Sequence, residues 1–244
     1  MNTKVKRNVD DNMYEDMNLE QIHEAASKGN VTAQYVLGTC YFEGRCVVQD
    51  DAKAVEWFRK AAEQGEARAQ SNLGLCYEKG RGVAQDYTKA AEWYRKAAEQ
   101  GADFAQHNLG MCYMKGHGVP RDYGKAFEWY RKAAEQGHAH SQCKLGICYY
   151  EGDGVAYDFV EAATWFLKAA KQGLASAQHN LGICYKLGRG VARDYAKAVK
   201  WFRKAAVQGN KEAQIRLSLC YQAGEGVPRN PEKAHYWQRQ AFSR

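Results

Sequence analysis

Three asparagines at equivalent positions are the residues of this sequence best suited to hold another molecule. Asn108 follows Asn72 by 36 residues, and Asn180 follows Asn108 by twice that interval. An asparagine amide both donates and accepts hydrogen bonds, so a row of them can bind the backbone of an extended peptide. Hydrogen bonds to a neighbouring helix are the alternative role for these amides.

Two further rows recur at the same interval. The first is mostly apolar and suits a hydrophobic side chain of a ligand, although packing between neighbouring helices explains it equally well. The second mixes aromatic, polar and thiol side chains. The apolar row is Thr39, Leu75, Met111, Ile147, Ile183 and Leu219, and the mixed row is Tyr35, Ser71, His107, Cys143, His179 and Ile215.

His107, His140 and Cys143 come closest to a metal-binding pattern. His140 precedes Cys143 by one helical turn and faces the same way, so the three could form a loose metal site. The sequence has no tight C-x-x-C or H-x-x-x-H pair. Ordinary polar residues of a binding surface are the better interpretation, and we predict no metal and no cofactor.

These rows exist because the whole sequence repeats. A fixed period of this length is the signature of a solenoid, in which each unit packs only on its neighbours. Three series share the 36-residue interval: Cys40, Cys76, Cys112, Cys148, Cys184 and Cys220; Trp57, Trp93, Trp129, Trp165, Trp201 and Trp237; and Gly29, Gly65, Gly101, Gly137, Gly173 and Gly209.

Each repeat is predicted to contain two helices. In the first repeat, Ala33, Leu37 and Tyr41 lie on one stripe of a helix over about 31–43. The second helix begins at the N-cap residue Asp50 and stops before Gly65. The predicted repeat units are 30–65, 66–101, 102–137, 138–173, 174–209 and 210–244.

Glycines at two places need a structural reason. Gly38 and its equivalents lie inside the first helix, where glycine costs about 1 kcal/mol relative to alanine, so we expect the second helix to approach closely there. The connector G-x-G-V at Gly80, Gly116, Gly152, Gly188 and Gly224 matches no nucleotide-binding fingerprint. Turn glycines with positive φ are the better interpretation. Cys46 replaces the second connector glycine of the first repeat, so that turn is expected to be strained or differently shaped.

The two ends depart from the repeat. Residues 1–16 lack the pattern and are predicted to be a flexible segment, and residues 17–28 align with a second helix and should form a leading helix. In the last helix, Gln238 replaces a large aromatic residue and Phe242 replaces an alanine. These changes predict a capping repeat, with Phe242 folded back as a lid.

Composition bounds the class of protein. The net charge of +7 arises largely from Arg-Lys pairs near helix C-termini, where cations suit the helix dipole. No run of about 18 apolar residues is present, so we predict no membrane span. The first residues lack the apolar core of a secretory signal.

A ladder of one cysteine per repeat is too widely spaced for disulfides. We therefore expect a cytoplasmic protein, with export by a signal-independent route as the alternative.

The repeat pattern A-Q-x-x-L-G-x-C/M-Y-x-x-G-x-G-V-x-x-D-x-x-K-A-x-x-W-Y/F-x-K-A-A-x-x-G resembles that of the Sel1-like repeat (SLR) family, relatives of the tetratricopeptide repeat. The resemblance covers residues 17–244. It implies an all-α fold, a right-handed α/α superhelix of six repeats with a leading helix and a C-terminal capping helix. It also implies an adaptor or scaffold for other proteins.

One face of each first helix varies between repeats while the opposite face hardly changes. Positions 32, 35, 36, 39 and 42 and their equivalents form this variable face. In the related solenoids the same face lines a concave groove, and those grooves use asparagine there. The predicted partner-binding residues are Asn72, Asn108, Asn180, Phe104, His107, Met111, Tyr150 and His179.

The sequence leaves three classes of function to weigh against one another. A protein-interaction scaffold or adaptor that binds a peptide or partner protein is favoured. RNA binding is the alternative, because some helical-repeat proteins read RNA. However, basic residues are scattered on the variable face, so nucleic acid is not favoured. No nucleophile–base pair, carboxylate dyad or cofactor loop recurs at catalytic spacing, so we predict no enzymatic activity.

Overall fold

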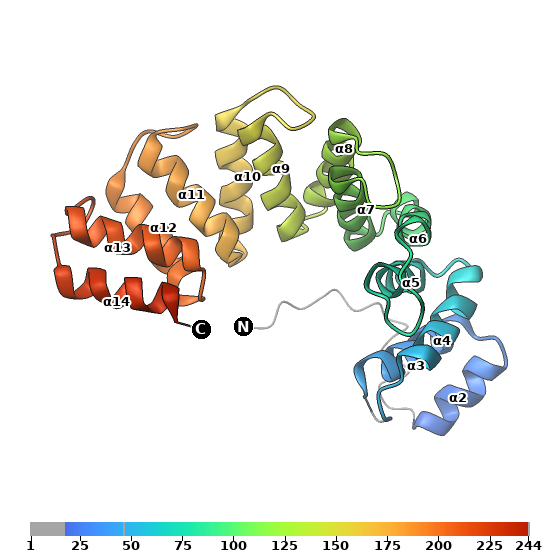
Figure 1. Cartoon of the computed structure of the whole chain (residues 1–244). Helices are drawn as coiled ribbons and strands as arrows, with labels where there is room; N and C mark the ends of the chain where they lie inside the picture. Colours follow the sequence, from blue (N-terminus) through green and yellow to red (C-terminus); the bar gives the residue numbers. More distant parts are fainter. Residues whose placement is uncertain (1–17, 46, 244) are drawn as a thin grey trace. The chain divides into compact units, whose positions relative to one another are not determined.

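A computed structural model describes residues 18–45 and 47–243, and these residues form thirteen α-helices and no strand (Figure 1). The predictions for residues 1–16 and for Cys46 lie outside the described residues. The chain divides into two compact units, Met1–Arg121 and Asp122–Arg244.

The first unit contains the leading helix and two complete repeats, followed by the first helix of the third. Within it, α3 packs on α4 and α5 packs on α6, and each pair contacts the next. We call the first helix of a repeat its A helix and the second its B helix. The helices are α2 (Leu19–Ser27), α3 (Val31–Glu43), α4 (Asp51–Glu63), α5 (Ala67–Lys79), α6 (Tyr87–Glu99) and α7 (Asp103–Lys115).

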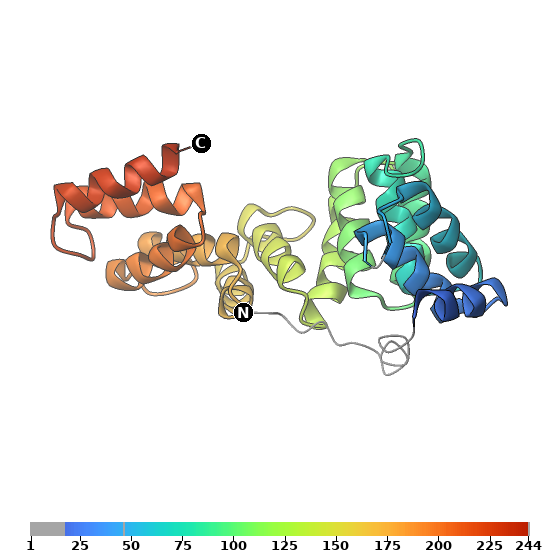
Figure 2. The ribbon, with the colours of Figure 1, turned by 90° about the horizontal axis from the view of Figure 1, so that it is seen from below.

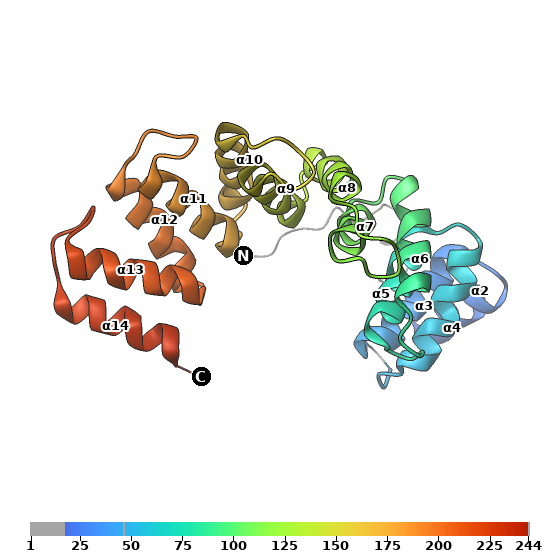
Figure 3. The same cartoon turned by 45° about the horizontal axis from the view of Figure 1, so that its top comes forward.

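The second unit begins with the B helix of the third repeat and holds three complete repeats. The last pair, α13 and α14, lies side by side in every view (Figures 2 and 3). The helices are α8 (Tyr123–Glu135), α9 (Ala139–Glu151), α10 (Phe159–Lys171), α11 (Ala175–Leu187), α12 (Tyr195–Val207), α13 (Lys211–Ala223) and α14 (Pro231–Phe242). The prediction of two-helix repeats with a leading and a capping helix is confirmed.

Local signals set the ends of the helices as the sequence predicted. The side chain of Asp50 accepts a hydrogen bond from the backbone N–H of Lys53 and caps α4. Each A helix ends at a glycine in the left-handed region, such as Gly44 with φ of 71°. The same aspartate or asparagine cap begins the other B helices, at Asp86, Asp122, Asp158, Asp194 and Asn230.

In four repeats the glycine inside the A helix receives an aromatic ring from its B helix. A Cβ atom at Gly74 would lie 2.7 Å from the Tyr94 ring, and that ring is completely buried. Phe58 and Phe202 pack on Gly38 and Gly182 in the same way. The prediction of a close helix approach is therefore confirmed.

In the last repeat a serine replaces this glycine. Gln238 stands where the other repeats have the ring, so Ser218 has room. Its hydroxyl donates a hydrogen bond of 2.8 Å to the carbonyl oxygen of Ala234. Phe242, expected to fold back as a lid, is instead 71% exposed.

Buried glutamines connect neighbouring helices, which the sequence analysis did not anticipate. The side-chain amide of Gln70 donates to the carbonyl oxygen of Ala62 at 3.1 Å, and its oxygen accepts from Gln100 at 2.8 Å. The same pair of bonds joins Gln178 to Ala170 and Gln208. Both polar atoms of Gln70 and of Gln178 are therefore bonded across neighbouring helices, whereas the side-chain oxygen of the equivalent Gln214 in the last repeat has no hydrogen-bond partner among the described residues.

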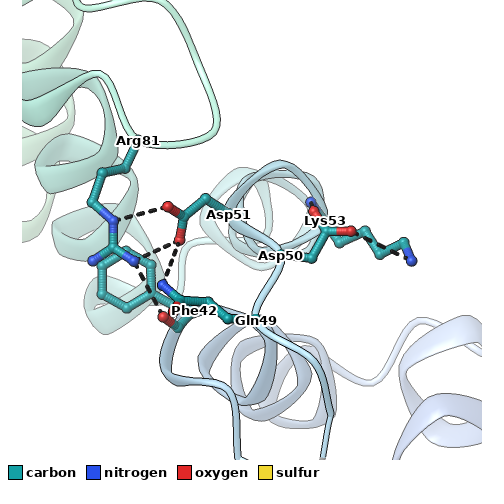
Figure 4. Close-up of polar contacts among 6 residues, drawn as sticks. All are labelled: Phe42, Gln49, Asp50, Asp51, Lys53 and Arg81. Atoms are coloured by element: carbon teal, nitrogen blue, oxygen red, sulfur yellow. Dashed lines mark hydrogen bonds and ion pairs between the residues drawn. The ribbon is translucent and has the colours of Figure 1, made fainter.

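The connectors join one repeat to the preceding one. Arg81, in the connector between α5 and α6, donates two hydrogen bonds to the carboxylate of Asp51 and one to the carbonyl oxygen of Phe42 (Figure 4). Its guanidinium lies 3.8 Å from the centre of the Phe42 ring. Gly82 follows with φ of 68°, and a Cβ there would overlap the carbonyl oxygen of Asp51. Positive φ and close backbone approach explain this connector glycine.

The cysteines of the ladder are free thiols among the described residues. Four ladder cysteines, Cys76, Cys148, Cys184 and Cys220, are almost completely buried. Burial raises the pKa of the Cys76 thiol to about 12, and Asp51 adds to the effect while Arg81 opposes it. These thiols are neutral and act as small apolar core residues.

The aromatic–glycine contact predicts the effect of enlarging the glycine. Gly74→Ala should destabilise the first unit by about 1–3 kcal/mol, because the added methyl group overlaps the Tyr94 ring and strain outweighs the gain in helix propensity. Urea unfolding followed by circular dichroism measures the change. Gly124→Ala is the control, because Gly124 lies in α8 and a Cβ there would contact only Asp122, at 3.5 Å. A Gly74→Ala protein as stable as the wild type would contradict the assignment.

The Arg81–Asp51 contact predicts a pH-dependent contribution to stability. The hydrogen bonds from Arg81 lower the pKa of Asp51 below its ordinary value of 3.8. The contact therefore stabilises the fold fully above that value and is lost as the pH falls through the folded pKa. Asp51→Asn should lower the free energy of unfolding by about 1 kcal/mol at neutral pH and by less in acid. Glu63→Gln, at an exposed carboxylate of the same helix, is the control. A cost that stays constant with pH would rule out this ionic contribution.

Candidate partner-binding site

The eight predicted binding residues all lie on A helices, five in the first unit and three in the second. The first unit holds Asn72 on α5 and Phe104, His107, Asn108 and Met111 on α7. The second holds Tyr150 on α9 and His179 and Asn180 on α11.

The variable face is partly covered by the A helix of the following repeat. The hydroxyl of Ser176, in the first turn of α11, lies 3.7 Å from the thiol of Cys143 on α9. In the first unit the guanidinium of Arg68 lies 4.3 Å from the centre of the Tyr35 ring. Both pairs are 33 residues apart. The starts of α5 and α11 therefore pack against the mixed-row residue of the preceding A helix.

The asparagine row is half-buried, and the amide of Asn180 has neighbours within the protein. The side-chain nitrogen of Asn180 lies 3.8 Å from the thiol of Cys143, and Asn180 also bonds the ring of His179. The side-chain nitrogen of Asn108 is inaccessible and has no hydrogen-bond partner among the described residues. At Asn180 the structure shows the alternative role, bonding to a neighbouring helix. The peptide-binding ladder stays a prediction.

A pocket of about 240 Å³ opens on the variable face of the second unit. Ile147 and Ile183, from the apolar row, form its sides, so this row lines a cavity here. Tyr150 is held in place because its hydroxyl accepts a hydrogen bond of 2.5 Å from Arg189 and its ring packs edge-on against Phe159. The lining residues are Ile147, Tyr150, Glu151, Phe166, Asn180 and Ile183.

The chemistry of this pocket suits one side chain of a protein ligand. Its walls are apolar and aromatic, and Asn180 and Glu151 supply a few polar groups. Ligand pockets with this composition bind an apolar group and orient it by polar contacts at the rim. Two of the predicted residues, Tyr150 and Asn180, are brought together here.

In the first unit, the predicted residues that are most accessible belong to α7. Phe104, in the first turn of α7, is 46% exposed, and His107 and Met111 on the same helix are half-buried. Asn72, on the neighbouring helix α5, is also half-buried. Arg68 occupies the position of Phe104 one repeat earlier, and the sequence analysis left it out of the site. Both residues are equivalents of position 32 of the variable face. This shared position was the sequence feature that could have identified Arg68.

The loose metal site considered from the sequence drew on His107, His140 and Cys143. His107 belongs to the first unit, whereas His140 and Cys143 belong to the second. Burial raises the pKa of the Cys143 thiol, while hydrogen bonds from Ser176 and Asn180 oppose the rise, so the thiolate is disfavoured. The described residues contain no group of three His, Cys, Asp or Glu side chains placed to hold a metal ion.

His179 is a neutral, half-buried histidine. Burial lowers its pKa below the ordinary value of 6.5, and the charge of Arg216 lowers it further. Its Nε2 atom is inaccessible and has no hydrogen-bond partner among the described residues. The ring centre lies 5.9 Å from that of Phe202. His179 therefore packs between α11 and the core, and part of its side chain is also accessible at the surface.

No helix in the described part of the chain has both the length and the apolar character needed to cross a membrane.

Comparison with known proteins identifies the repeat. The family model of the Sel1 repeat matches six consecutive segments: 31–66, 67–101, 103–138, 139–174, 175–210 and 211–244. No curated protein matches the chain.

Two solved structures are similar over almost the whole chain. One is c5321, a protective antigen present in uropathogenic Escherichia coli strains that displays an SLR fold, with 42% identity and a TM-score of 0.87 over 93% of this chain. The chain spans 48% of that protein, about half its length. The other is a Sel1 repeat protein from Oxalobacter formigenes, with 36% identity and a TM-score of 0.83, covering 95% of this chain and 90% of that one.

A third structure shares the fold at lower identity. It is the immunity protein PA5088 from Pseudomonas aeruginosa, with 23% identity and a TM-score of 0.55, covering 86% of this chain and 80% of that one. Together with the helix pairs described above, these similarities confirm the prediction of an all-α solenoid.

The buried position of His179 predicts acid sensitivity. Because its folded pKa lies below 6.5, its contribution to stability is complete above that pH and is lost as the pH falls through the folded value. His179→Gln should therefore lose less stability than the wild type between about pH 7 and pH 5. Thermal unfolding at both values measures the difference, with His140→Gln, at an exposed histidine, as the control. An NMR titration midpoint of the His179 ring above 6.5 would contradict the prediction.

Proposed function

This chain belongs to the Sel1 repeat family, and we propose that it is a non-enzymatic scaffold or adaptor that binds a peptide or partner protein on the variable face of its A helices. Proteins of this family generally mediate protein–protein interactions. The proposal extends that general role to a particular surface of this chain.

The observation that carries the proposal is the pocket around Tyr150 and Asn180. Four of the six lining residues belong to the variable face, whose residues differ between repeats because packing does not constrain them. They are Ile147, Tyr150, Asn180 and Ile183. A preformed pocket with apolar walls and few polar groups is a common form of binding site. It would take an apolar side chain from an extended segment of the partner.

The core of each repeat supports a scaffold role in a second way. The positions that stabilise the fold, such as Leu37, Leu73 and Leu145, are completely buried. Because stability is supplied by these positions and by the inter-repeat contacts, residues on the variable face are free to match a partner.

An adaptor needs no reacting group, and the side chains around the pocket fit that role. Glu151 and Asn180 are its polar lining residues, and the nearby cation Arg189 is bonded to Tyr150. These polar groups suit recognition of a partner's side chain, and none of them is a nucleophile with an adjacent base. The family is generally non-catalytic. The comparisons give no support to the alternative of RNA binding.

We place the protein in the cytoplasm, with export by a signal-independent route as the alternative. The free cysteines described above support a reducing compartment. Fractionation of the producing cells, followed by immunodetection of the chain, tests this location.

Removal of the pocket groups should abolish partner binding without unfolding the protein. The double variant Tyr150→Ala, Asn180→Ala should retain its partner at least about ten-fold less well than the wild type, because two polar and aromatic contacts are lost. Affinity purification with the full chain as bait, quantified by mass spectrometry, measures retention. Val160→Ala, at a residue of α10 that is 63% exposed and outside the pocket, is the matched control. Equal recovery of all proteins by wild type and double variant would refute the site.

A further inference from the structure

Almost all of the net charge of this protein lies in one repeat. The fifth repeat unit, residues 174–209, contains seven basic residues and one acidic residue, so its net charge is +6, compared with +7 for the whole chain. A concentration of one charge in a single repeat favours interaction with a molecule of opposite charge. The basic residues are Lys186, Arg189, Arg193, Lys197, Lys200, Arg203 and Lys204, and the acidic residue is Asp194.

Part of this charge is neutralised within the second unit. Lys186 pairs with Glu225 at 2.7 Å, and Lys197 pairs with Asp194, the N-cap residue of α12, at 3.2 Å. The other three cations of α12 form no ion pair in the described part of the chain. They are Lys200, Arg203 and Lys204.

These three cations form a stripe along the exposed side of α12. Lys200 and Lys204 are separated by one helical turn and Arg203 lies next to Lys204, so the three side chains share a face of the helix. All three are exposed. Val207 continues the stripe by another turn and is 69% exposed. We call these four residues the basic stripe.

The basic stripe has an electrically balanced counterpart in three other repeats. In α8, the guanidinium of Arg131 lies 2.7 Å from the carboxylate of Glu128 and 4.0 Å from that of Glu135. In α12, Lys200 occupies the position of Glu128 and Val207 occupies that of Glu135. The arginine of α12 therefore has neither carboxylate. The corresponding glutamates of the first two repeats are Glu56 and Glu63 in α4, and Glu92 and Glu99 in α6.

Neutral neighbours hold two of the cations in place. The hydroxyl of Tyr221 accepts a hydrogen bond of 2.7 Å from Arg203, and the Nζ atom of Lys204 lies 4.4 Å from the centre of the Trp201 ring. Neither contact neutralises a charge. Because both side chains are already oriented, a ligand that binds them causes a smaller loss of side-chain freedom.

Carboxylates of a protein fit the stripe better than phosphates of a nucleic acid or a lipid. The stripe extends over about 10 Å of helix, and its three cations are fewer than the about four to eight that mark a lipid-binding cluster. The ring of Trp201 lies against Lys204 and packs against the buried cluster of α10 and α11, so it is not free to stack on a base. Val207 adds an apolar contact that a peptide side chain can match.

We propose that the basic stripe of α12 docks an acidic segment of a partner protein, whose carboxylates take the place of the missing glutamates and whose apolar side chain contacts Val207. These ion pairs lie at an exposed surface, so salt weakens the binding. The pocket around Tyr150 and Asn180 contains no residue of α12. Either surface can therefore bind a partner without the other, and the stripe adds a second docking surface to the function proposed above.

Fluorescence anisotropy with a labelled synthetic peptide of glutamates around a central leucine tests the proposal. The full chain should bind this peptide at least about ten-fold more tightly than a peptide with glutamine in place of each glutamate. Binding should weaken as sodium chloride rises from about 0.05 to 0.5 M.

The double variant Lys200→Glu, Val207→Glu restores the two glutamates of the balanced stripes. It should bind the acidic peptide at least about ten-fold more weakly than the wild type, because the new carboxylates pair with Arg203 and repel the ligand. Glutamate occupies both positions in three other repeats, so the fold should be retained, and circular dichroism checks this. Unchanged binding in this variant, or no binding to the wild type, overturns the proposal.

The double variant Lys125→Glu, Val160→Glu is the matched control. It changes the same residue types and the same number of charges in the second unit, but on α8 and α10. Other repeats have Glu161 and Glu232 at the equivalent positions. The affinity of this control for the acidic peptide should stay within about two-fold of the wild type. An equal loss in both double variants would mean that net charge alone attracts the peptide, and the proposal would be wrong.

Single-stranded RNA, duplex DNA and vesicles of phosphatidylcholine with phosphatidylserine test the other anionic partners. If one of them binds more tightly than the acidic peptide and loses its binding in the α12 variant, the stripe recognises phosphate and the proposal is wrong. The double variant Tyr150→Ala, Asn180→Ala should bind the acidic peptide like the wild type, and a loss there would contradict docking on α12. Failure of the basic stripe and failure of the pocket are therefore separate results.

Discussion

The contact between an aromatic ring of the B helix and a glycine of the A helix governs the geometry of each repeat. In the second repeat, Tyr94 lies so close to Gly74 that no side chain fits between them. Such contacts fix the separation of the two helix axes, because the ring meets backbone on one side and buried alanines on the other. When the ring is lost, as at Gln238, the glycine is also lost and a serine takes its place with a hydrogen bond to the B helix. The two positions thus change together because they touch.

A different set of contacts aligns one repeat with the next. The buried glutamines bond the carbonyl oxygens of the preceding B helix and the glutamine at the end of their own B helix. The connector residues add contacts whose chemistry changes along the chain. Arg81 bonds Asp51 in the first unit, whereas in the second unit Arg189 bonds Tyr150 and Lys186 bonds Glu225 at 2.7 Å. Because these pairs involve residues of the variable face as well as the connector, differences between repeats alter both the inter-repeat contact and the surface offered to a partner.

The pocket shows a consequence of stacking similar building blocks. Between repeats, side chains of the apolar row are only half-covered, and where they are spaced apart a cavity such as that between Ile147 and Ile183 is left. A solenoid therefore produces, from one repeated pattern, a lateral surface that differs from repeat to repeat.

The sequence by itself determined the elements of this protein. The caps at Asp50 and its equivalents, the left-handed glycines and the interval of 36 residues are local or periodic signals, and they predicted the helices and their pairing. The tertiary structure decided which side chains meet across repeats. That Asn180 bonds the thiol of Cys143 and that Ser176 covers it depends on how far each A helix is shifted and rotated relative to the one before. That offset is set jointly by many packing contacts, and no single residue encodes it. The sequence could therefore name the face that varies, but only the packing of neighbouring repeats decided which of its residues line a cavity and which are already bonded within the protein.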